Sequence, residues 1–155
     1  SGATAALLTA LMVLINVPGN LAGGWLLARG VRRGPMTIAA FAIMALCAVG
    51  MLLDVLPNAP RFLLVLVFSA CAGVIPAAVF SGVPVHARSA RHVGTSNGLV
   101  MQSSQASQFV APIALAWLAA RYGSWSASLS AMLALAACGV ACGFALQLIE
   151  SRRGR

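Results

Sequence analysis

Long apolar stretches alternate with short polar turns along almost the whole chain. Each stretch exceeds 20 residues. A helix rises about 1.5 Å per residue, so each stretch would cross a hydrocarbon layer of about 30 Å. The pattern predicts an all-α fold, an integral membrane bundle of five helices followed by a tail over residues 150–155. The helices are expected at residues 3–28, 35–56, 62–85, 94–120 and 125–149.

The composition also indicates a membrane protein. Residues of the AVILMFWYC class make up 61% of the chain and charged residues 8%, against about a quarter charged in ordinary soluble domains. A soluble domain of about 150 residues leaves roughly 30% of its unfolded-chain surface exposed. Such a domain could not hide this much apolar surface, so the lipid bilayer is an expected partner.

The net charge of +8 comes from arginines that lie in the predicted turns and the tail. If alternate turns share a side, one side holds Arg61 and Arg121, and the other holds Arg29, Arg32, Arg33, Arg88, Arg91, Arg152, Arg153 and Arg155. Cytoplasmic loops are enriched in arginine. We therefore expect a multi-pass protein of a bacterial plasma membrane with a cytoplasmic C-terminus. No basic face with interleaved aromatics is present, which argues against nucleic acid as a partner.

Two short segments of the chain resemble each other. Residues 25–30 (WLLARG) end the first stretch and residues 117–123 (WLAARYG) end the fourth, each several residues after a proline. If both stretches cross a membrane, the segments face opposite sides, as inverted repeats do in secondary transporters. Chance similarity between Leu/Ala-rich strings is the open alternative. A repeat would leave residues 62–85 without a counterpart, so we expect the chain to be the later part of a longer protein.

Residues 24–33 (GWLLARGVRR) resemble the G-x-x-x-D-R-x-G-R-R loop signature of the major facilitator superfamily of transporters. Ala28 replaces the acidic residue and Val31 the second glycine, whereas the matching residues are Gly24, Arg29, Arg32 and Arg33. The run from residue 94 to residue 125 is similar to the last two helices of that superfamily. The resemblance implies the last five of twelve helices, forming a partial six-helix C-terminal bundle.

The same resemblance implies a function and partners. These transporters move a small-molecule substrate by alternating access, in some cases with a coupling ion. The implied protein partners are the missing N-terminal bundle and the missing first helix of this half. Carriers driven by protons usually place an acid or histidine at membrane depth, and this chain has none away from the ends of its stretches. Any coupling residue is therefore expected outside it.

Polar side chains within the apolar stretches are the candidate site residues. On the fourth stretch one helical stripe carries Asn97, Met101, Ser104, Gln105, Gln108 and Pro112, with Gln102 at its margin. Asn16 and Asn20 share a face of the first stretch. An amide without a partner in hydrocarbon costs roughly 2 to 7 kcal/mol, so these residues are expected at a substrate cavity or a helix interface. Simple hydrogen bonding between helices remains the alternative.

Prolines and glycines complete the helix predictions. Pro18, Pro76 and Pro112 are expected to kink their helices, although a buried bundle also tolerates prolines. The G-x-x-x-G pairs at residues 19–23 and 139–143 are expected to let other helices approach closely.

The remaining reactive residues do not form a recognisable site in the sequence. The four cysteines lie inside apolar stretches, and His86 and His92 flank an arginine-containing turn. The acids, Asp54 and Glu150, are far apart in the chain. We therefore expect no enzyme, no metal site and no cofactor. Two alternatives to a carrier stay open, namely a small non-transporting membrane subunit and a self-assembling half-carrier.

Overall fold

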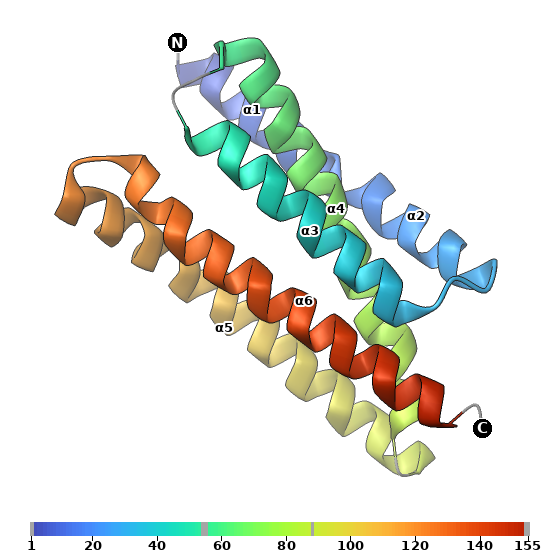
Figure 1. Ribbon diagram of the computed structural model, residues 1–155. Coiled ribbons are helices and arrows are strands. Elements are labelled where there is room, and N and C mark those ends of the chain that lie inside the picture. The colour runs from blue at the N-terminus through green and yellow to red at the C-terminus, as the bar shows by residue number, and fades with distance from the viewer. Residues whose placement is uncertain (1, 54–55, 88, 154–155) are drawn as a thin grey trace.

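The computed structural model describes residues 2–53, 56–87 and 89–153 as a bundle of helices (Figure 1). No strand occurs in these ranges. The elements in chain order are α1 (Gly2–Leu14), α2 (Asn16–Ala28), α3 (Arg33–Leu52), α4 (Asn58–His86), α5 (Ala90–Tyr122), the 3-10 helix η1 (Trp125–Ala127) and α6 (Ser128–Arg153). The predicted all-α class is confirmed. Asp54, Arg88 and Arg155 lie outside the described residues.

The turns between helices alternate between the two ends of the bundle (Figure 1). Gly30 and Gly123 adopt positive φ angles of 87° and 69° just after α2 and α5, a conformation that glycine adopts without steric cost. One end brings together the α2–α3 turn, the end of α4, the start of α5 and the end of α6. We call it the arginine end, because it holds the described residues Arg29, Arg32, Arg33, Arg91, Arg152 and Arg153.

Among the residues that the structure describes, four helical segments are long and apolar enough to span a membrane, whereas five spans were predicted. They are Gly2–Ala28, Arg33–Leu52, Asn58–His86 and Ser128–Arg152. The predicted span at residues 94–120 does form a helix, since α5 covers it with 33 residues. Its serines and glutamines between residues 102 and 108 keep its hydropathy too low for the same assignment. The helix predicted at residues 94–120 is therefore present, and its crossing of the membrane stays a prediction.

Large apolar side chains cover the outside of the bundle, and small ones fill its interior. Leu7, Leu21, Leu46 and Phe109 are all at least 70% exposed. Among the described residues the buried hydrophobic side chains are Met36, Ala40, Cys47, Ala48, Ala78, Ala119 and Ala136. A soluble protein rarely exposes such extensive apolar patches. The surface is compatible with a membrane protein.

Glycines on α2 and α4 allow these two helices to pack with their backbones close together. A Cβ added to Gly19 would overlap the backbone of Ala70, and one added to Gly73 would overlap the carbonyl of Asn16. A Cβ on Gly23 would lie 3.0 Å from the Cβ of Ala77. Only residues without a side chain fit at such distances.

The helices α3 and α6 pack in the same way. A Cβ added to Gly139 would lie 2.5 Å from the ring of Phe41, and one added to Gly143 would lie 2.7 Å from Cγ1 of Ile38. Gly34 on α3 faces Gln147 on α6, with a hypothetical Cβ-to-Cβ distance of 2.7 Å. The bundle is therefore held by the close pairs α2 with α4 and α3 with α6, and α3 also packs extensively against α4.

The three prolines that were expected to kink helices differ in whether the helix is interrupted near them. The first helical segment is interrupted at Ile15, three residues before Pro18, and this interruption separates α1 from α2. Pro18 has no N–H to donate to the carbonyl of Leu14. In contrast, α4 continues through Pro76 and α5 continues through Pro112.

Candidate functional site

The middle of α5 carries a stretch of polar side chains that the rest of the described structure does not cover. Every residue from 101 to 110 is exposed. Nε2 of Gln108 donates hydrogen bonds to Oε1 of Gln105 at 3.0 Å and to Oγ of Ser104 at 3.3 Å. Gln102 is exposed on the same helix. We call residues 102–108 the polar stretch of α5.

Asn97 also lies on α5, but it is less exposed than the polar stretch. It is half-buried, and its Oδ1 is a buried atom with no hydrogen-bond donor among the described residues. The predicted stripe is therefore divided between an enclosed end at Asn97 and an open middle at Gln105 and Gln108. Buried acceptors in native proteins normally have a partner.

Asn16 joins helices instead of standing alone in a cavity. Its Nδ2 donates to the carbonyl of Ser69 on α4 at 3.0 Å, and Oγ of Ser69 donates to the carbonyl of Met12 on α1 at 2.6 Å. Both bonds connect Ser69 to residues next to the junction between α1 and α2. Asn20, four residues later, is exposed. The two candidate asparagines thus have different surroundings, and only Asn16 has an interhelical role.

Arg33 is the centre of a polar cluster at the arginine end. Its Nε and Nη2 donate to Oγ and the backbone carbonyl of Ser81, each at 3.1 Å. Its Nη1 donates to Oε1 of Glu150 at 2.8 Å. Nε2 of His86 lies 4.0 Å from the same oxygen. The guanidinium therefore links α3, α4 and α6, and we call Arg33, Ser81, His86 and Glu150 the Arg33 cluster.

The other residues of the loop motif do not join this cluster. Arg29 stacks its guanidinium 3.8 Å above the ring of Trp25, while Arg32 is exposed before α3. Gly24 is exposed, and a Cβ added to it would meet no described atom within 4 Å. Ala28 carries no carboxylate, and the acid that pairs with Arg33 is Glu150, near the other end of the chain.

The sequence did not identify Ser81, Ser69 or Glu150 as partners. Glu150 was assigned to a tail, yet it lies in the last turns of α6 and is 17% exposed as a side chain. One signal was present, since alternating turns place residues 33 and 150 at the same end. An ion pair between an arginine and Glu150 at that end was therefore predictable. The rotation of α6 that directs Glu150 toward Arg33 was not.

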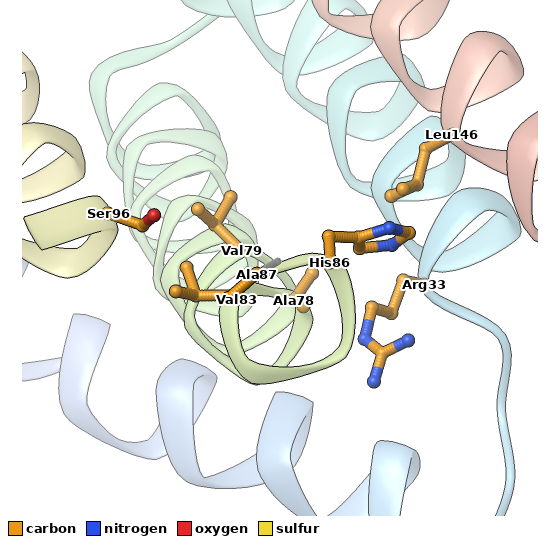
Figure 2. Close-up of a pocket in the computed structure, with 9 residues that line it drawn as sticks. Arg33, Ala78, Val79, Val83, His86, Ala87, Ser96 and Leu146 are labelled. Atoms are coloured by element: carbon orange, nitrogen blue, oxygen red, sulfur yellow. The ribbon is translucent and has the colours of Figure 1, made fainter. Parts of the chain in front are cut away.

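A cavity of about 330 Å³ lies next to the Arg33 cluster. Arg33, His86 and Leu146 lie on one side of the end of α4, whereas Val79, Val83 and Ser96 lie on the other (Figure 2). The cavity therefore combines a cationic group with aliphatic side chains. Within the described ranges, no three His, Cys, Asp or Glu residues are grouped as a metal would require.

A second cavity, of about 280 Å³, lies nearer the other end and is apolar. Phe41, Phe68, Leu115 and Met132 line it from four different helices. It has no group for acid–base or polar recognition chemistry. Compared with this apolar cavity, the one at the arginine end can recognise charge, because Arg33 lines it. No known protein family, characterised protein or solved structure shows significant similarity to the chain.

Proposed function

We propose that the chain forms part of a secondary carrier of the major facilitator type, which moves a small polar solute across a membrane by alternating access. The observation that carries this proposal is the uncovered polar stretch of α5, set among helices that are apolar enough to span a membrane. Four apolar segments alone would need only lipid around them. A long helix with three glutamines in its middle needs a protein or water-filled environment.

The energetic argument concerns Gln102, Gln105 and Gln108. Exposing one amide to hydrocarbon costs roughly 2 to 7 kcal/mol, and the mutual bonds of Gln105, Gln108 and Ser104 use only part of their hydrogen-bonding capacity. Both the N–H and the C=O groups remain available to a solute. An aqueous pathway along α5, closed on its far side by a second helical bundle, satisfies these groups.

The interruption between α1 and α2 also supports a carrier. Transporters often interrupt a helix where it borders a binding site. Here Asn16 and Ser69 bridge the junction, while Asn20 is exposed one turn later. We propose that Asn20 and the polar stretch of α5 contact the second bundle or the solute. The further helix implied by the family resemblance would complete this half.

The arginine end indicates how the protein is oriented in the membrane in this proposal. Six described arginines lie at that end, whereas Arg61 and Arg121 lie at the other. By the positive-inside rule, the arginine end and the C-terminus face the cytoplasm, and a bacterial plasma membrane is the proposed location. The Arg33 cluster would then hold the cytoplasmic ends of α3, α4 and α6 together.

Solute uptake in cells that express the full-length protein tests the proposal. A panel of small polar solutes is screened first, and Gln105→Leu is then compared with Ala106→Leu, which alters a neighbouring exposed position without removing an amide. We expect about a tenfold loss of uptake for Gln105→Leu only, corresponding to about one hydrogen bond. Equal uptake by both variants would remove Gln105 from the pathway.

The protein purified from the same cells can also be tested for binding to other proteins and to itself. These measurements distinguish the carrier from a non-transporting subunit and from a self-assembling half-carrier. A stable complex with an unrelated protein and no solute movement would replace the carrier by a non-transporting subunit. A transporting dimer of this chain would identify a self-assembling half-carrier, which needs a symmetric interface between copies.

A further inference from the structure

The cavity at the arginine end has a cationic side and an aliphatic side, as an amphiphilic anion requires. We propose that it binds one anionic phospholipid, with the headgroup phosphate at Arg33 and His86 and the start of an acyl chain against Val79 and Val83. This inference needs only a membrane around the helices. It does not depend on the transport proposal.

The cationic side retains hydrogen-bonding capacity after the contacts within the protein are formed. A guanidinium has five N–H donors in a fixed fork, and three of the bonds that Arg33 donates are those to Ser81 and Glu150. The remaining donors belong to Nη1 and Nη2, which match the geometry of phosphate oxygens. The imidazole of His86 lies on the same side of the cavity (Figure 2).

The balance of charge at this end favours an anion. Glu150 is the only acid that the structure describes there, while the described arginines at this end are Arg29, Arg32, Arg33, Arg91, Arg152 and Arg153. The ion pair with Glu150 neutralises Arg33, so the surplus positive charge of this end lies on the other arginines. The surplus positive charge attracts the anionic surface of a bilayer, and basic pockets between transmembrane helices bind anionic headgroups.

The aliphatic side favours a phospholipid over a free phosphate ion. Val79 and Val83 are four residues apart and therefore share a face of α4. Ser96 on α5 lines the same side, and Leu146 on α6 adds an apolar side chain beside Arg33 and His86. A volume of about 330 Å³ is at the lower limit for small-molecule sites. It suits a headgroup and the first part of a chain, with the remaining hydrocarbon in the bilayer.

Native mass spectrometry of the purified full-length chain tests the site. The protein is titrated with phosphatidylglycerol and with phosphatidylcholine of the same acyl composition, and the bound lipid is counted. We expect phosphatidylglycerol to bind about tenfold more tightly. Equal binding of the two lipids would overturn the proposal.

Two substitutions on α4 form a matched pair. Val83→Trp fills the aliphatic side of the cavity, while Val67→Trp places the same side chain at an exposed position nearer the other end of α4. We expect only Val83→Trp to weaken phosphatidylglycerol binding, by about tenfold, with the thermal unfolding midpoints of both variants within a few degrees of each other. Unchanged binding by Val83→Trp would overturn the assignment.

Competition with inorganic phosphate separates the two sources of the anion. We expect phosphate at millimolar concentration to leave the bound phosphatidylglycerol in place, because it cannot replace the hydrocarbon contacts. If phosphate displaces the lipid completely, and does so equally in the Val83→Trp variant, the cavity is a site for free anions and the lipid proposal fails.

Discussion

Arg33, the first residue of α3, donates a hydrogen bond of 2.8 Å to Glu150 near the end of α6, 117 residues later in the chain. The same guanidinium donates to Ser81 on α4. The side chains of Arg33 and Glu150 are 22% and 17% exposed, so water screens the pair only in part. Three helices are therefore tied together at one end of the bundle by a single arginine.

Removal of the carboxylate should weaken this end of the bundle. We expect Glu150→Gln to lower the free energy of unfolding by about 1 to 2 kcal/mol, between the effects typical of exposed and of buried ion pairs. Unfolding in mixed micelles measures the change. Arg152→Gln, which removes an exposed charge nearby, should change the same free energy by less than about 0.5 kcal/mol. Equal effects of the two substitutions would show that the ion pair has no specific role.

The close approach of α3 and α6 predicts that Gly143 does not accept a larger residue. Gly143→Val would place its Cβ 2.7 Å from Ile38 and 3.3 Å from the carbonyl oxygen of Gly34. Overpacking of this kind costs about 1 to 3 kcal/mol. The matched control is Gly24→Val, where a Cβ meets no described atom within 4 Å. A thermal unfolding series should show a lower midpoint for Gly143→Val only, and similar midpoints would contradict the packing of α3 on α6.

The junction between α1 and α2 provides a third prediction. Ser69→Ala removes the donor to the Met12 carbonyl and leaves Asn16 bonded to the backbone of residue 69. We expect a loss of about 0.6 kcal/mol in the free energy of unfolding, the average for hydrogen bonds between transmembrane helices. Asn16→Leu should lower the free energy of unfolding further, because it removes the donor to the Ser69 carbonyl and introduces a bulkier side chain at a tight interface. If Asn20→Leu, at an exposed position, matches the effect of Asn16→Leu, the interhelical role of Asn16 is refuted.

The length of α5 predicts the topology of its two ends. Its 33 residues correspond to about 50 Å at about 1.5 Å per residue, more than a hydrocarbon layer of about 30 Å. Cysteines introduced at Ser89 and Ser124, in a chain freed of its own four cysteines, should therefore react with impermeant maleimides from opposite sides. Labelling of both from one side would show that α5 lies along the membrane or re-enters it.

Helix positions were predictable because they depend on local features. Apolar stretches of sufficient length, broken by residues such as Gly30 and Gly123, determine where helices begin and end whatever packs against them. The close packing at Gly19, Gly23, Gly139 and Gly143 was also expected from their spacing. The helix predicted at residues 94–120 is present as α5, but its serines and glutamines make it less apolar than the four candidate spans, so its place in a membrane depends on what covers it.

The amino-acid order was sufficient to predict that the chain is helical, that its outer surface is apolar and that arginines lie together at one end of the helices. These properties follow from composition and from the order of the stretches. The contacts between side chains were visible only once the helices were packed. Glu150 reaches Arg33, Ser69 reaches Met12 and Asn16, and the amides of α5 remain uncovered. Such contacts depend on the rotation of each helix about its axis and on its distance from its neighbours, and many distant side chains determine both together.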